Sequence, residues 1–278
     1  MICIILLIIV VLILYPLLYI VSLSVSDPGA VSRGEVTFLP VDFTLDTYKY
    51  VLQDSRLGSS YINSIVYAVT GTLSSVVFTG LMAYPLSVSS FSLKKPLTII
   101  IMITMYFSGG MIPTYMVIKN LGFIDTLWAI IMPGAVSAYN VIIYRTFFSS
   151  IPTALRESAV IDGAGHLKIY YKIILPLSKP LIATMSLFSA VGLWNNYFEP
   201  LIYLNDYSKQ PLSLLLRQMV IQLEFSNQNM KDLVQSLTVN TRTIRAATML
   251  AAMLPIMCVY PFLQKYFTSG MMLGSVKG

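Results

Sequence analysis

The sequence predicts an all-α membrane protein with six transmembrane helices, and three observations support this fold class. The composition is strongly apolar, with 56% hydrophobic residues and a mean hydropathy of +0.75. Only 11% of the residues are charged, whereas an ordinary globular domain has about 25%. Six apolar stretches are each long enough to cross about 30 Å of hydrocarbon. A water-soluble fold could not bury this much apolar surface, so the bilayer is the expected solvent.

The predicted spans follow one another along a single transmembrane domain, residues 1–278. They lie near 2–24, 62–88, 97–118, 127–148, 181–203 and 246–267. The first stretch has no charged region before it and no A-x-A cleavage site after it, so we interpret it as a retained helix rather than a signal peptide. The loop at 211–224 predicts a short amphipathic helix that lies on the membrane surface or caps a cavity.

Glycine and proline interrupt three of these spans. The interrupting residues are Gly109, Gly110, Pro113, Pro133, Gly134 and Pro255. Such breaks are tolerated where neighbouring helices or a water-filled cavity satisfy the freed backbone groups. They are therefore compatible with ordinary helix packing and with a translocation pathway along the broken helices.

The charged residues indicate an orientation. The formal net charge is +6, but the few basic residues lie between apolar spans, so membrane orientation explains them better than nucleic-acid binding. With the adjacent helix ends, segments 89–96, 149–180 and 268–278 hold nine of the 18 Lys and Arg residues in the shorter share of the loop sequence. This distribution favours cytoplasmic N- and C-termini.

Few side chains are available for catalysis or metal binding. His166 is the only histidine, and Cys3 and Cys258 both fall in apolar runs. We therefore predict no catalytic residues, no metal site and no disulfide.

The loop between the fourth and fifth spans has the most informative sequence. Residues 151–180 read IPTALRESAVIDGAGHLKIYYKIILPLSKP. Pro152 suits a first helical turn, and Gly163 suits a C-cap or a tight turn. A second helical stretch follows and is predicted to end at Pro176. The expected structure is helix, turn, helix, with small residues on one face of the first helix that allow another protein to approach closely.

This loop resembles the EAA loop of ABC-importer permeases, whose pattern is Glu-Ala-Ala, three residues, Gly, nine residues, Ile-x-Leu-Pro. All spacings fit, and Ser158 replaces the middle alanine. The residues that the resemblance assigns to ATPase coupling are Glu157, Ser158, Ala159, Asp162, Gly163, Ile173, Leu175 and Pro176. In that family, the loop forms a coupling helix that sits in a cleft of the ATPase.

The resemblance extends over nearly the whole chain. Segments 107–136, 194–204 and 260–278 are similar to the carbohydrate-uptake branch and, within it, to the LplC/YtcP type. The resemblance implies a type I ABC importer permease fold in a bacterial plasma membrane. It also implies a heterodimer with a second, LplB-like permease, two ATPase subunits, and an extracellular solute-binding protein that delivers an oligosaccharide.

The chain itself is expected to be neither an enzyme nor a nucleotide-binding protein. It contains no G-x-x-x-x-G-K-[ST] sequence, the phosphate-binding loop of many ATPases. No cofactor is therefore expected on this chain, and ATP and Mg are expected on the partner ATPase subunits.

The fifth span carries an unusual density of polar and aromatic residues, which are Trp194, Asn195, Asn196, Tyr197 and Glu199. Sugars need aromatic faces and amide or carboxylate groups, so this cluster is a candidate for the substrate pathway. Interhelical hydrogen bonding with interfacial aromatic residues explains it equally well. Asn63 and Asn140 are weaker candidates.

Two other functional classes compete with the importer permease. A secondary transporter or channel would act without an ATPase, but ion coupling usually needs ionisable residues inside the membrane. The first three predicted spans contain none. A membrane enzyme would need a nucleophile–base pair or a metal set, and the single histidine lies in the loop at 151–180.

Overall fold

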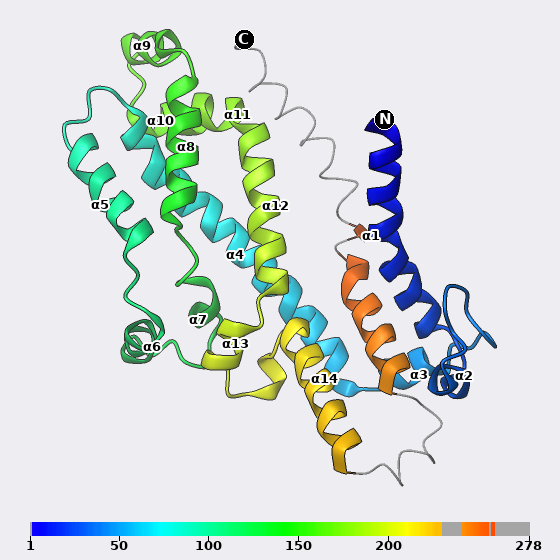
Figure 1. The fold of residues 1–278 in the computed structure, drawn as a ribbon. Coiled ribbons are helices and arrows are strands. Elements are labelled where there is room, and N and C mark those ends of the chain that lie inside the picture. Colours follow the sequence, from blue (N-terminus) through cyan, green and yellow to red (C-terminus); the bar gives the residue numbers. More distant parts are fainter. Residues whose placement is uncertain (1, 230–240, 256, 259–278) are drawn as a thin grey trace. The chain divides into compact units, whose positions relative to one another are not determined.

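The computed structural model describes residues 2–229, 241–255, 257 and 258, and all regular secondary structure in these residues is helical (Figure 1). The chain divides into two compact units. Among the described residues, the first unit comprises 2–63 with 208–229, 241–255, 257 and 258, and the second comprises 64–207.

The first unit contains α1 (Ile2–Ser24), α2 (Pro28–Arg33), α3 (Asp46–Leu52), the start of α4 (Ser55–Ser87), α14 (Leu212–Asn229) and helical residues 241–255. Side chains join its segments: Tyr48 Oη donates to Ser24 Oγ at 2.9 Å. The amide of Asn63 donates to the Ser208 carbonyl at 2.7 Å. Asn63 thus serves to hold two backbone segments together.

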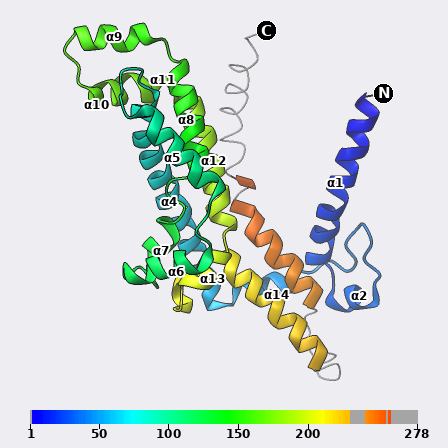
Figure 2. The same cartoon turned by 60° about the vertical axis from the view of Figure 1, so that its left-hand side comes forward.

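The second unit contains most of the remaining helices. They are the rest of α4, then α5 (Lys94–Tyr106), α6 (Met111–Asn120), α7 (Leu127–Ile131), α8 (Ala138–Ser150), α9 (Thr153–Ile161), α10 (His166–Ile169), the π-helix η1 (Tyr170–Ile174), α11 (Leu175–Leu177), α12 (Lys179–Asn195) and α13 (Phe198–Tyr203), with the 3₁₀ turn η2 (Tyr207–Lys209) following. Figures 1 and 2 both place α9 and α10 at one end of this unit and α6, α7 and α13 at the other.

An aromatic core holds the α9 end of the second unit together. Tyr144 and Phe148 of α8 pack with Tyr170 of η1, and all three are at most 2% exposed. The ring centroids of Tyr144 and Phe148 lie 5.7 Å apart in an edge-on arrangement, and those of Phe148 and Tyr170 lie 6.3 Å apart. The helices after α9 are therefore fixed to α8 through buried rings.

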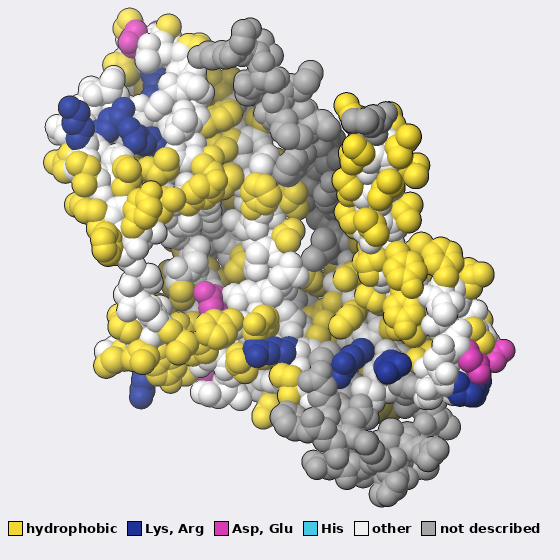
Figure 3. All heavy atoms as spheres, in the orientation of Figure 1, with side chains coloured by type: hydrophobic (Ala, Val, Ile, Leu, Met, Phe, Trp, Pro, Cys, Tyr) yellow, Lys and Arg dark blue, Asp and Glu magenta, His cyan; other side chains and the backbone are white. Residues whose placement is uncertain are grey.

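Two of the described helices are long and apolar enough to cross a membrane, α1 and α4. The bounds of α1 are those predicted, whereas α4 begins at Ser55, before the predicted residue 62. Apolar side chains cover the visible face of α1 (Figure 3). Two further pairs of helices are long and apolar enough only when their members are taken together, and each pair is sharply bent. The bend is 115° between α5 and α6, and 81° between His166–Leu177 and α12.

The breaks inside the third and fourth predicted spans occur at the glycine and proline residues. Gly110 has a φ of 84°, a conformation that glycine adopts without strain, and α6 begins at the next residue. Pro113 lies in the first turn of α6, where its missing N–H is not needed. Helix α7 ends at Ile131, Pro133 and Gly134 follow, and α8 begins only at Ala138.

The prediction of one continuous helix over 181–203 was wrong. Helix α12 ends at Asn195, and α13 starts at Phe198. The cause is Pro200: a continuing helix would pair residue 200 with the Asn196 carbonyl, and proline has no N–H and clashes with that carbonyl. The predicted helix around 211–224 is confirmed as α14. Residues 246–255, 257 and 258 of the sixth predicted span are helical, and its remainder lies outside the described residues.

Candidate functional site

The loop at 151–180 has the predicted order of helix, turn and helix. Pro152 is the N-cap of α9, and its ring fixes the backbone where the chain leaves α8. The second helical stretch does not end at Pro176 as predicted. It passes through the π-helix η1 and α11, and it ends at Ser178, whose N–H bonds to the Ile174 carbonyl at 3.0 Å.

Gly163 ends α9 in a conformation that explains the spacing of the motif. Its φ is +74°, a left-handed conformation, so the predicted tight turn is confirmed. The N–H of Gly163 bonds to the Val160 carbonyl at 3.0 Å, and the N–H of Ala164 bonds to the Ala159 carbonyl at 2.9 Å. This pair of bonds is a Schellman motif, in which the first position past the C-cap is left-handed and is usually glycine. The glycine must therefore stand four residues after Ala159.

The motif residues separate into an inward and an outward set. Ala159, Ile173 and Leu175 pack against the aromatic core, together with Ala164. The outward set, which is exposed, consists of Glu157, Ser158, Asp162, Gly163 and Pro176. The small residue at 159 thus serves the protein's own packing, whereas the neighbouring small residue, Ser158, faces outward and donates to the Ala154 carbonyl at 2.9 Å.

Helix α9 has an apolar outer surface that the described residues leave uncovered. None of its residues is fully buried. Ile161 is 85% exposed, and Val160, Leu155 and Leu167 are also exposed. Among the residues that the structure describes, no cation forms an ion pair with Glu157. The surface therefore offers exposed apolar side chains with a carboxylate beside them, and an apolar patch with a polar rim marks an interaction site.

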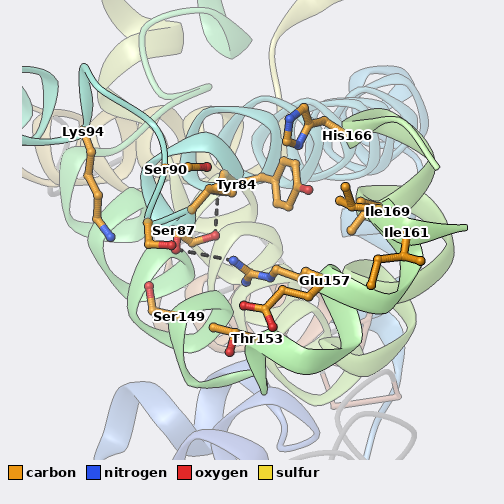
Figure 4. A pocket seen from close by; sticks show the side chains of 14 residues that line it. Tyr84, Ser87, Ser90, Lys94, Ser149, Thr153, Glu157, Ile161, His166 and Ile169 are labelled. Carbon is orange, nitrogen blue, oxygen red and sulfur yellow. Dashed lines mark hydrogen bonds between the residues drawn. The ribbon is translucent and has the colours of Figure 1, made fainter. Parts of the chain in front are cut away.

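A cavity of about 630 Å³ lies beside α9. It is open to one side and is lined by the end of α4, the loop before α5, and residues of α8, α9 and α10. Figure 4 shows the side chains of Glu157 and Thr153 at its edge. His166, the single histidine of the loop, is exposed at the start of α10 and also lines this cavity. Lys94 of α5 and residues of α9 thus line one cavity.

Arg156 is a residue whose importance the sequence did not reveal. It lies on α9 beside the motif, yet its guanidinium turns inward to the ends of α4 and α8. Burial lowers the pKa of Arg156, and the neighbouring Tyr84 acts in the opposite direction. Arginine nevertheless stays charged at neutral pH, so a half-buried cation anchors α9.

The polar cluster at 194–199 lies at the opposite end of the second unit, around the break between α12 and α13. Trp194 is buried. Asn196 and Glu199 bind each other: Asn196 Nδ2 donates to Glu199 Oε2 at 2.7 Å, and the Glu199 N–H donates to Asn196 Oδ1 at 3.3 Å. Asn195 and Tyr197 are exposed. The predicted cluster thus divides into residues that shape the break and residues that face outward.

The all-helical fold, the broken helices and the EAA-type loop define a permease subunit of a transport system. Comparison with known proteins gives the family. Residues 57–272 match the family described as "binding-protein-dependent transport system inner membrane component". The chain belongs to this family, and the predicted recognition, fold and transport role are confirmed. It is a membrane permease of an importer rather than an enzyme.

Two curated relatives come from Bacillus subtilis (strain 168). The chain is 44% identical to Protein LplC over 95% of its own length and 89% of the relative. It is 42% identical to the polygalacturonan/rhamnogalacturonan transport system permease protein YtcP over 95% and 92%. A chain from a solved bacterial ABC transporter involved in the import of the acidic polysaccharide alginate superposes with a TM-score of 0.88 at 35% identity, covering 95% of this chain and 94% of that one.

Proposed function

We propose that this chain is one of two permease subunits that together form the pathway for an oligosaccharide in an ATP-driven importer, with α9 as the helix that docks on an ATPase subunit. The observation that carries the proposal is the outer surface of α9. A helix of nine residues is marginal by itself in water, and this one leaves Leu155, Val160 and Ile161 exposed. A protein partner that covers these side chains accounts for both features.

The role as a permease subunit of an ATP-driven importer implies its partners. They are a second, LplB-like permease, two ATPase subunits that carry ATP and Mg, and an extracellular solute-binding protein. The chain crosses the membrane several times, with both termini and α9 in the cytoplasm. The basic residues of 89–96 and 149–180 support this orientation.

An oligosaccharide that contains uronic acids is the substrate class best supported. The names of relatives mention polygalacturonan/rhamnogalacturonan and alginate. On this chain, the exposed Asn195 and Tyr197 supply an amide and an aromatic hydroxyl beside the break after α12. Such groups bind sugar hydroxyls and the apolar faces of sugar rings.

Reconstitution tests this function. The chain is combined in proteoliposomes with its partner permease, ATPase and binding protein, and uptake of labelled oligogalacturonide is followed. We expect uptake that needs both ATP and the ATPase subunit. Uptake that continues without the ATPase would favour a secondary transporter, and failure with oligogalacturonide but success with a neutral oligosaccharide would overturn the substrate class alone.

A further inference from the structure

Arg156 lies at a point where three helices meet. Its Nη1 donates to the Ser87 carbonyl at 3.4 Å, and its Nη2 donates to the Phe148 carbonyl. Ser87 is the last residue of α4, and Phe148 lies in the last turn of α8. One guanidinium on α9 thus reaches the C-terminal ends of two long helices.

Both carbonyls need a donor from outside their own helix. The last four carbonyls of an α-helix have no intrahelical partner. For Phe148, the residue four positions on is Pro152, which has no N–H to donate. For Ser87, the corresponding residue is Phe91, whose N–H points instead to the Val88 carbonyl at 3.5 Å. Arg156 supplies the missing donors.

The charge of Arg156 also complements the two helix ends. The C-terminus of a helix carries about half a negative charge and favours a cation within its last turn. Neither α4 nor α8 has a basic residue in its own last turn. Among the described residues no carboxylate pairs with Arg156, so the negative helix ends and the Tyr84 ring, whose centroid is 5.9 Å from Cζ, surround the guanidinium.

This arrangement fixes the inner flank of α9 while its outer flank stays free. Successive helical residues point about 100° apart, so Arg156 faces inward and Glu157 faces outward. Lys94, the first residue of α5, lines the same cavity (Figure 4), and among the described residues no ion pair joins it to α9. Besides the packing of Ala159 and the short connection to α8, Arg156 is therefore a direct polar link from α9 to the ends of α4 and α8.

We propose that Arg156 is a positioning residue for energy coupling: it clamps α9 to the C-terminal ends of α4 and α8, so that the three helices move together when a partner displaces α9. The role in energy coupling rests on the proposed function, whereas the clamp, which is the pair of hydrogen bonds from Arg156 to α4 and α8, does not. The EAA-type motif does not include this position.

The test uses the assembled importer with Arg156→Gln, Arg156→Lys and a matched control, Lys95→Gln, which removes an exposed cation from α5. Hydrogen–deuterium exchange of the α9 amides measures how firmly Arg156 holds this helix. Losing a charge-assisted hydrogen bond should speed amide exchange in 153–161 roughly tenfold in Arg156→Gln, with a smaller effect in Arg156→Lys and none in Lys95→Gln. Unchanged exchange in Arg156→Gln overturns the proposal.

The amount of sugar taken up per ATP hydrolysed measures the energy coupling. We expect Arg156→Gln to assemble and to hydrolyse ATP, but to transport several-fold less per ATP, with partial rescue by Arg156→Lys. Faster exchange with wild-type uptake per ATP overturns the coupling role. If Arg156→Gln does not assemble, amide exchange and uptake per ATP are measured in Arg156→Lys instead, and unchanged values of both overturn the proposal. A wild-type importer without ATP-driven uptake refutes the proposed function, and the exchange data still decide whether the clamp exists.

Discussion

Gly163 shows how one backbone angle sets the end of the proposed coupling helix. A Cβ added at Gly163 would meet no atom within 4 Å, so any penalty for substitution comes from its φ of +74°. A left-handed conformation costs an ordinary residue about 1–2 kcal/mol, and it is a genuine outlier for a β-branched residue. The position is therefore restricted by conformation and not by space.

We predict that Gly163→Val abolishes uptake while the subunit remains in the membrane, and that Gly163→Asn retains most of the uptake. Asparagine is enriched in the left-handed region, so it keeps the Schellman turn with a side chain present. Uptake normalised to membrane abundance measures the effect. Normal uptake by Gly163→Val would show that this turn is not needed.

The polar residues of 194–199 have separable roles. Asn196 and Glu199 bind each other, whereas the Asn195 side chain forms no hydrogen bond among the described residues and is exposed. We predict that Asn195→Ala and Tyr197→Phe each lower affinity or rate for the sugar roughly five-fold, the effect of one lost hydrogen bond.

Asn196→Ala provides the matched comparison. It should lower the thermal stability of the detergent-solubilised chain because it removes the pair that shapes the start of α13. Uptake kinetics and thermal unfolding distinguish the two sets of residues. Wild-type kinetics and substrate range in both Asn195→Ala and Tyr197→Phe would mean that the sugar pathway lies elsewhere.

At the scale of elements, α4 approaches η1 so closely that only glycine fits at one point. A Cβ on Gly80 would collide with Tyr170 Oη, and Tyr170 is buried among rings that leave it little room to move. We predict that Gly80→Ala destabilises the protein by about 1–3 kcal/mol through overpacking.

Gly192 in α12 is the matched control, since a Cβ there would meet no atom within 4 Å. Gly192→Ala should leave stability unchanged or raise it by up to about 1 kcal/mol, because alanine favours the helix. Thermal unfolding in detergent compares the two variants. Equal melting temperatures for Gly80→Ala and Gly192→Ala would contradict the close contact.

Sequence patterns predicted some elements well for identifiable reasons. The loop at 151–180 carries strong local signals, because Pro152 and Gly163 fix the backbone whatever surrounds them. The first span was equally clear from its unbroken apolar run. The break at Asn196 is hard to predict because its cause, Pro200, lies four residues further on, beyond the point where the helix ends.

Other features depend on tertiary contacts that no local pattern encodes. The role of Arg156 depends on carbonyls of Ser87 and Phe148, which the fold brings to it from two other helices. The division of the polar cluster likewise depends on the Asn196–Glu199 pair, which forms only once the helix has broken. A pattern of residue types predicted the cluster but not its division.

At the scale of the whole molecule, the orientation in the membrane can be measured separately from transport. We predict that position 168 faces the cytoplasm and that the loop at 204–245 faces outward. Single cysteines are introduced after replacement of Cys3 and Cys258, which are both exposed, and are labelled with an impermeant reagent on intact cells. Labelling of Lys168→Cys from outside would reverse the orientation.

The partner of α9 can be identified by crosslinking in the assembled importer. Ile161→Cys, at an 85% exposed position, carries a photoactivatable crosslinker. Tyr207→Cys, at a 66% exposed position just after α13, serves as the control. We predict that the crosslinker at position 161 captures the ATPase subunit and that the one at position 207 does not. Capture of the ATPase from position 207, with none from position 161, would contradict the assignment of α9 as the coupling helix.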